Sequence, residues 1–339
     1  MTKKILLGAV VVILAGAALL YGLGIVKLNL GAHAGICQRD EEIAPPTRAA
    51  IEAAAMTYVR TVLSADPASG YAMMTKEVQA ASTPLKFTAA MMAVKAMQPT
   101  GRLQVARSYF IQSAGSGPDA RTVCGPLSDS QWVSLEIKPG REQAHVEIDG
   151  QARNNGLAFT LWLLPEQGDW RVESFHAAYS SIVGLTPEML LKRAREESTL
   201  GHRFNATMLY AGAQATVDRG PAFQLGVRQD LQQDLRTFPL PPEFQGTPPF
   251  TWKMNGHAYS VSQVTIVGVD GKLGLIFLLP QKTWTDNQAA DRVNRAFLND
   301  FIATHGDYRR AFQFLVARAL KPDKSGGFGT AYETGKGFQ

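Results

Sequence analysis

Histidine is the side chain best suited to acid–base or metal chemistry near neutral pH, and the chain has six histidines, at positions 33, 145, 176, 202, 257 and 305. A metal site needs several histidine, cysteine or carboxylate ligands that converge, and neither HxH nor HExxH spacing occurs. GxSxG, GxGxxG and Walker A motifs do not occur either. We therefore expect no metal and no cofactor, and no motif names a reaction.

His176 is the histidine best placed for chemistry, because it shares one face of an expected strand with Trp170, Val172 and Ser174. A titratable group in an apolar cavity has a perturbed pKa and can act as a base. The candidate ligand pocket consists of His176, Trp162, Trp170 and Tyr58. A histidine that only makes a structural hydrogen bond at the end of a sheet is the alternative.

His145 is a weaker candidate, because the apolar residues Ala144, Val146 and Ile148 alternate with it. The alternation predicts that His145 lies beside Glu147 on the solvent-facing side of its strand.

The first half of the chain supplies the elements that must position these residues. Apolar side chains at helical spacing predict a helix over 48–64 and two methionine-rich helical stretches near 68–80 and 84–97. The period then changes to that of strands, which are expected at 102–113, 130–138, 142–150, 156–164 and 169–177. Turn residues separate them, as in Asn154-Asn155-Gly156. This order predicts helices followed by an antiparallel meander.

The second half predicts a smaller α+β domain. A helical run to about Asp218 is followed by a helix with Phe223, Val227, Leu231 and Leu235 at a spacing of four. Strands are expected near 252–256 and 264–268, and closing helices near 287–303 and 307–320. The glycine-rich residues 321–339 are expected to form a flexible tail. Short matches between 146–150 and 264–268 leave a degenerate repeat of the first domain open.

The N-terminus contains a membrane-length apolar segment, Ile5 to Val26, without any charged residue. At about 1.5 Å per residue it spans roughly 33 Å, close to the hydrocarbon thickness of about 30 Å. Lys3 and Lys4 precede it, so the positive-inside rule places the N-terminus in the cytoplasm and the body outside. We expect a single-pass protein of the inner (cytoplasmic) membrane. The alternative is a signal peptide cleaved after Ala34, which would give a secreted protein.

The charge and the cysteines narrow the class of partner and the compartment. Three positive charges of the net +5 flank the apolar segment, so the nearly neutral body is not expected to bind nucleic acid. Cys37 and Cys124 are the only cysteines, and in an oxidising compartment they are expected to form a disulfide. Two unpaired thiols are the alternative.

Residues 47–180 resemble the nuclear transport factor 2-like cone fold, in which helices close one side of a bent antiparallel sheet. The resemblance rests on the element order and on a closing strand that begins Gly168-Asp169-Trp170-Arg171-Val172. That fold hosts enzymes as well as binding and assembly domains. Enzymes of the ketosteroid-isomerase type place carboxylates in the cavity, whereas here Glu147, Asp149 and Glu173 alternate onto the face opposite the apolar one. This departure favours a binding role over catalysis.

The sequence thus predicts an α+β protein in five parts: a cytoplasmic stub and transmembrane anchor (1–30), a linker (31–46), a nuclear transport factor 2-like domain (47–183), a second α+β domain (184–320) and the tail (321–339). The expected function is a non-catalytic, membrane-anchored binding or assembly module of a bacterial envelope complex, with an envelope protein or a second copy as partner. A small-molecule-binding or isomerase-like pocket protein is the alternative. The architecture is also similar to that of inner-membrane components of type IV secretion and conjugation channels.

Overall fold

A computed structural model describes residues 36–64, 66–126, 131–323 and 325–339. The predicted membrane segment 5–26 and the cleavage site after Ala34 lie outside these residues. Within the described ranges, no helix combines the length and the apolar character needed to cross a bilayer.

The chain folds as two compact units, each a mixture of helices and sheets. Of the described residues, unit 1 comprises those up to Arg153, residues 157–178 and residues 219–226, and unit 2 comprises residues 154–156, 179–218 and those from 227 onward. Residues 219–226 of the second half thus belong to unit 1, and residues 154–156 of the first half belong to unit 2.

A five-stranded sheet forms the centre of unit 1, with the strand order β1-β2-β5-β6-β7. All the long strands match predicted strands, and the added edge strand β1 pairs antiparallel with β2. The bounds are β1 (Ile36–Arg39), β2 (Thr100–Gln112), β5 (Glu142–Ala152), β6 (Asn155–Glu166) and β7 (Asp169–Ser181).

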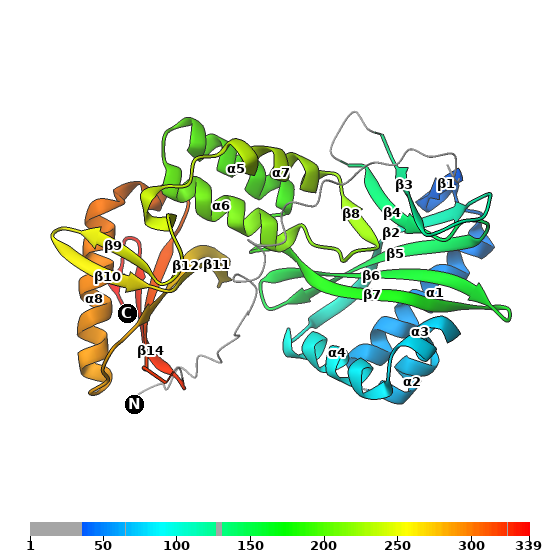
Figure 1. The fold of residues 1–339 in the computed structure, drawn as a ribbon, viewed down its shortest axis with the longest axis horizontal. Coiled ribbons are helices and arrows are strands. Elements are labelled where there is room, and N and C mark those ends of the chain that lie inside the picture. Colours follow the sequence, from blue (N-terminus) through cyan, green and yellow to red (C-terminus); the bar gives the residue numbers. More distant parts are fainter. Residues whose placement is uncertain (1–35, 65, 127–130, 324) are drawn as a thin grey trace. The chain divides into compact units, whose positions relative to one another are not determined.

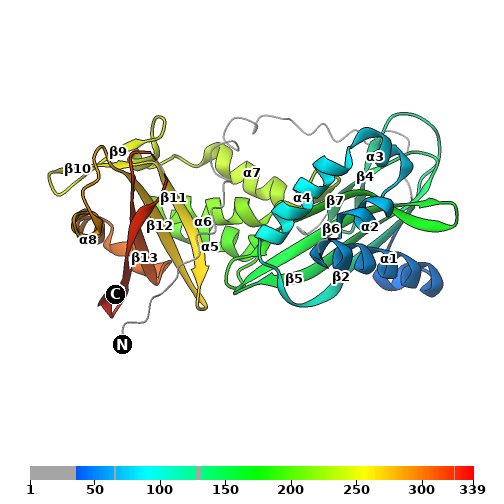
Figure 2. The same cartoon turned by 90° about the horizontal axis from the view of Figure 1, so that it is seen from below.

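Four helices cover one face of this sheet (Figures 1 and 2). The longest, α1, buries Ile51, Ala55, Tyr58, Val59 and Val62, a spacing that places them on one side of a helix. The helices are α1 (Pro45–Ser64), α2 (Pro67–Ala72), α3 (Lys76–Ala81) and α4 (Pro84–Ala96), with a 3-10 turn at Asp40–Glu42 before them.

A second, three-stranded sheet covers the opposite face of unit 1 (Figure 1). It consists of β3 (Ala120–Cys124), β4 (Val133–Ile137) and β8 (Phe223–Leu225), in that order. Its apolar residues pack with Tyr109 and Ile111 of β2. Cys37 of β1 and Cys124 of β3 form the predicted disulfide, with Cα atoms 5.9 Å apart.

Unit 2 contains a sheet of strand order β11-β12-β13-β14-β15, in which β12 and β13 are parallel and joined through α8. In unit 1, by contrast, β1 and β2, β2 and β5, β3 and β4, and β4 and β8 all pair antiparallel. The strands are β9 (Phe250–Met254), β10 (His257–Val261), β11 (Gln263–Val269), β12 (Lys272–Pro280), β13 (Phe314–Leu320), β14 (Gly327–Glu333) and β15 (Gly337–Phe338). The helices are α5 (Pro187–Thr199), α6 (Arg203–Thr216), α7 (Val227–Thr237) and α8 (Asn287–Thr304), and 3-10 turns occupy Pro242–Phe244 and Gly306–Arg310.

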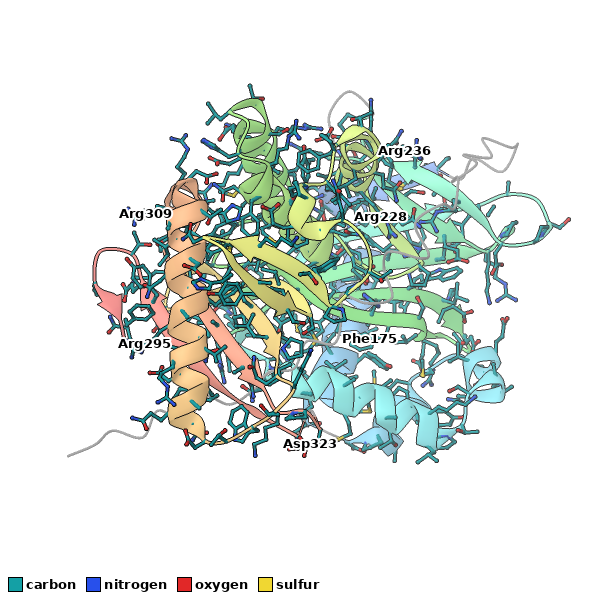
Figure 3. The ribbon with its side chains drawn as sticks, turned by 60° about the vertical axis from the view of Figure 1, so that its left-hand side comes forward. Phe175, Arg228, Arg236, Arg295, Arg309 and Asp323 are labelled. Atoms are coloured by element: carbon teal, nitrogen blue, oxygen red, sulfur yellow. A yellow bond between two sulfur atoms is a disulfide. The ribbon has the colours of Figure 1, made fainter. Side chains whose placement is uncertain are left out.

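Two predictions for the end of the chain are wrong. Residues 307–320 do not form a helix, because residues 314–320 alternate between buried and half-buried as β13 and pair with β12. Residues 327–333 are not a flexible tail but pair with β13. Gly327 lies so close to the Ala319 carbonyl that a Cβ would clash. A glycine at this position therefore allows β14 to approach β13 closely. Arg295 of α8 holds the last strand, with its guanidinium 4.6 Å from the centroid of the Phe338 ring (Figure 3).

Loss of the disulfide is expected to destabilise unit 1, because the bond closes a loop over a sequence separation of 87 residues. Replacing both cysteines, Cys37→Ser with Cys124→Ser, should lower the free energy of unfolding by about 2 to 5 kcal/mol. Urea unfolding measures this, and wild type with reductant should match the double variant. Equal midpoints for wild type with and without reductant would contradict the prediction.

Candidate functional site

The covered face of the unit 1 sheet holds most of the polar groups that could do chemistry, and a short segment far along the chain closes it. We call residues 219–226, which include β8, the strap. Main-chain bonds fix it to β4: the Glu136 amide donates to the Ala222 carbonyl at 2.9 Å, and the Gly226 amide donates to the Trp132 carbonyl at 2.8 Å. The strap is thus bound as an added strand.

Two strap side chains anchor it to the sheet below. The ring of Phe223 is buried, with its centroid 5.7 Å from that of Tyr109 in an edge-to-face arrangement. Arg219 donates from Nε to a carboxylate oxygen of Glu147 at 2.7 Å, and its side chain and that of Glu147 are 5% and 8% exposed. The Thr160 hydroxyl donates to the Arg219 carbonyl at 2.7 Å. Removing one partner of such a buried ion pair leaves the other charge buried and unpaired, which strongly destabilises the fold.

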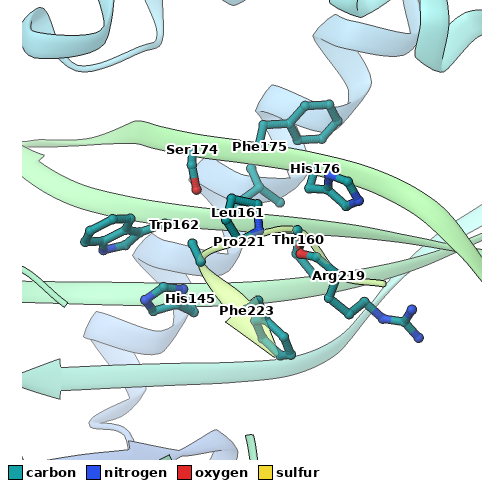
Figure 4. A pocket seen from close by; sticks show the side chains of 12 residues that line it. His145, Thr160, Leu161, Trp162, Ser174, Phe175, His176, Arg219, Pro221 and Phe223 are labelled. Atoms are coloured by element: carbon teal, nitrogen blue, oxygen red, sulfur yellow. Dashed lines mark hydrogen bonds between the residues drawn. The ribbon is translucent and has the colours of Figure 1, made fainter. Parts of the chain in front are cut away.

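A cavity of about 70 Å³ remains between the strap and the sheet. Figure 4 shows the side chains that line it, among them His145, Thr160, Trp162, Ser174 and His176 from the sheet. One water molecule occupies about 30 Å³ in the liquid, so this space is of the size of about two waters.

His145 is the polar group held most tightly in this cavity. Its ring stacks on Trp162 at 5.5 Å, and its Nε2 donates to the Glu136 carbonyl at 2.8 Å, which leaves Nδ1 as an acceptor. Nδ1 has no hydrogen-bond partner among the described residues. Burial lowers the pKa of His145 to about 3, so the ring is neutral and a poor base at neutral pH.

Two further polar contacts lie at this end of the sheet. Trp162 donates from Nε1 to Gln143 at 3.0 Å. Lys138 forms a salt bridge with Glu173 at 2.6 Å, and its ammonium lies 5.9 Å from the centroid of the Trp162 ring. Burial alone would lower the pKa of Lys138, but its hydrogen bonds to Glu173 and Glu77 raise it. The lysine therefore stays charged and neutralises a carboxylate that could otherwise act as a base.

The structure divides the four residues of the predicted pocket. His176 and Trp162 line the cavity together. Tyr58 lies on the helix side, 5.3 Å from Phe175 between ring centroids, where burial raises its pKa. Trp170 packs against Phe110 at 6.3 Å and does not line the cavity. The pocket as predicted from the sequence is therefore not one site.

The prediction that His145 and Glu147 face solvent is wrong, since they are 1% and 6% exposed. Alternation places a polar side chain in solvent only where one face of the sheet is exposed, whereas here the small sheet and the strap cover the second face. A signal was present in Leu157 to Leu164, where apolar residues occupy both alternating positions, as is typical of a strand buried on both faces.

Among the described residues, no three histidine, cysteine or acidic side chains gather in a way that could hold a metal ion. The chain matches no protein-family model, no curated protein and no solved structure. The resemblance to the nuclear transport factor 2-like fold therefore stays a prediction.

The buried pair between Arg219 and Glu147 can be tested by removing one or both charges. Arg219→Met should lower the free energy of unfolding by about 3 to 5 kcal/mol, because it leaves the Glu147 carboxylate buried and unpaired. Adding Glu147→Met should recover part of the loss. Arg236→Met, at an exposed arginine of α7 (Figure 3), is the matched control and should change little. Equal losses for Arg219→Met and Arg236→Met in urea unfolding would show that the pair does not hold the strap.

The pKa of His145 predicts a specific pH dependence of stability. Because the folded pKa of about 3 lies below the unfolded value of about 6.5, the unfolded chain binds the proton more readily. The contribution of neutral His145 is therefore complete above pH about 6.5 and is lost as the pH falls toward about 3. His145→Phe keeps the stacking on Trp162 and should remove this component, on the order of 5 kcal/mol. Parallel plots of unfolding free energy against pH for the two proteins would contradict it.

Proposed function

We propose that this protein is a membrane-anchored, extracytoplasmic binding or assembly module of a cell-envelope complex, and that it is not an enzyme. The segment Ile5 to Val26 anchors it, and both units lie outside the cytoplasm. A component of a type IV secretion or conjugation channel is the specific complex whose architecture is similar.

The disulfide supports the compartment in this proposal. Disulfides persist in oxidising compartments and are rare in the cytosol. Cys37 lies ten residues after Lys27, at the start of the described chain, and its bond to Cys124 fixes that start to unit 1. The disulfide therefore links the segment that follows the proposed anchor covalently to the fold of unit 1.

The observation that carries a binding role over catalysis is the closed sheet face of unit 1. Sites for small molecules usually offer about 300 to 1,000 Å³, whereas the cavity beside His176 has about 70 Å³. Glu147 pairs with Arg219 in the strap, and Glu173 pairs with Lys138. The carboxylates that could act as catalytic bases are thus paired within the fold. A binding role would therefore use the outer surfaces of the protein.

One observation favours the alternative, a pocket protein of the cone type. The Nδ1 atom of His145 is an acceptor without a partner among the described residues, in a side chain that lines the cavity. Displacement of the strap would enlarge this space and expose that acceptor to a ligand.

The location is tested on the full-length chain produced in a bacterial host. The chain should stay in carbonate-washed membranes, and maleimide-polyethylene glycol should modify two thiols only after reduction. A variant lacking residues 2–27 is the control, and it should leave the membranes and carry two free thiols. A full-length chain with free thiols before reduction would contradict the location.

The role is tested by two further measurements on the same membranes. Cross-linking should trap the full chain in a discrete larger complex, and hydrophobic small molecules should not bind stoichiometrically in calorimetry. Stoichiometric binding that is lost in Trp162→Ala and His176→Ala would instead establish the pocket alternative.

A further inference from the structure

The helix α4 of unit 1 is apolar on both sides, although only one side is covered. Its inner side buries Phe87, Met91 and Val94 against the unit. On its outer side Leu85 and Met92 are 79% and 55% exposed, and both are among the most exposed large apolar side chains of the described residues. Figure 2 shows α4 in the helix layer of unit 1.

The exposed apolar side chains of α4 form one continuous stripe. Leu85, Ala89, Met92 and Ala96 follow at intervals of four, three and four residues, which places them on one face of a helix. A continuous apolar stripe on a helix face is normally buried, so the exposed α4 face has the composition of a covered surface. We call these four residues the α4 stripe.

The charge on α4 indicates what covers the stripe. Lys86 and Lys95, both exposed, stand near the two ends of the helix, and α4 contains no acidic residue. Neither lysine has a salt-bridge partner within the described part of the chain. An apolar stripe between two free lysines is suited to a surface that is apolar inside and negatively charged at its rim.

A second copy of the chain does not meet this requirement. In a twofold-symmetric, antiparallel contact through the α4 stripe, residue i of one helix faces residue j of the other and the reverse. A contact centred between Ala90 and Met91 would place Lys86 against Lys95 twice. Such like-charge contacts oppose association.

A lipid surface meets the requirement better than an acidic protein. Apart from the two lysines, the outer face of α4 offers no charged group that would select the sequence of a protein partner. Leucine and methionine insert into the boundary between headgroups and acyl chains, while lysine stems let the ammonium groups reach the phosphates.

The chain itself would hold unit 1 near such a surface. This step rests on the proposed function, since it takes Ile5 to Val26 as the membrane anchor. Nine residues, 27–35, separate that segment from Ile36, and a chain of this length reaches at most about 30 Å. A weak contact becomes effective when a short tether keeps its two sides together.

We propose that the α4 stripe, with Lys86 and Lys95, docks unit 1 on the anionic headgroups of the membrane that holds the N-terminus. Docking uses the outer face of α4 only, so the fold of unit 1 and the strap stay unchanged. Unit 1 would thereby have a fixed orientation toward the membrane.

The test uses the full-length chain reconstituted in vesicles of phosphatidylcholine alone or with added phosphatidylglycerol. A photoreactive phosphatidylglycerol with a diazirine in its acyl chain reports which residues touch lipid, by mass spectrometry of the peptides. Adducts are expected on residues 84–96 in the anionic vesicles and should be much weaker when the photoreactive lipid is phosphatidylcholine.

Variants separate the charge from the apolar contact. Lys86→Glu with Lys95→Glu should reduce the adducts on α4 by at least about fivefold for each lysine, the factor expected for one charge at an anionic surface. Leu85→Ser with Met92→Ser should reduce them as well. Lys253→Glu with Lys282→Glu makes the same change in net charge at exposed positions of unit 2 and should leave the adducts unchanged. The Cys37–Cys124 disulfide, checked in each variant, reports that unit 1 is folded.

Each result decides between the two proposals. A chain that stays in the vesicles but carries no adducts on α4, or equal adducts in the charge variant, overturns lipid docking and leaves the anchor standing. A chain that does not stay in the vesicles overturns both. Cross-links from α4 to α4 of another copy that grow with protein concentration, in place of lipid adducts, would assign the stripe to self-association and also overturn lipid docking.

Discussion

The structure of unit 1 depends on covering both faces of its five-stranded sheet. Helices cover one face, and β3, β4 and the strap cover the other. Every polar side chain that points from the sheet toward the strap must then be paired within the protein, because an unpaired buried charge is costly. Glu147 meets Arg219, His145 meets the Glu136 carbonyl and Trp162 meets Gln143. These contacts therefore engage the titratable groups on this face of the sheet.

The same constraint explains which features could be predicted from the sequence. Strand positions were predicted within a few residues where turn residues bound an alternating run, as in Glu142 to Ala152. The disulfide was predictable because only two cysteines exist and export was expected. The side that His145 faces was not predictable from its own strand, because it depends on residues 219–226, which are about 75 positions further along the chain.

The end of the chain shows the same limit for unit 2. Helix α8 was predicted correctly, since its apolar residues Val293, Phe297 and Phe301 keep helical spacing over more than two turns. Residues 314–320 form a segment so short that its apolar side chains fit the spacing of a helix or of a strand. Pairing with β12 makes this segment a strand. The glycines after Ser325 suggested flexibility, whereas Gly327 permits close contact with β13. Pairing between distant strands thus determined the structure of both segments that the sequence did not predict.

The proposed binding role rests on the closed sheet face of unit 1. That account requires the strap to be a stable part of the core of unit 1. Native-state hydrogen exchange of the Glu136 and Gly226 amides, which bond the strap to β4, measures this directly. The account predicts that both amides exchange as slowly as those of the central strands β5 and β6. Exchange of these two amides at the rate of an unprotected loop, with β5 and β6 still protected, would contradict it.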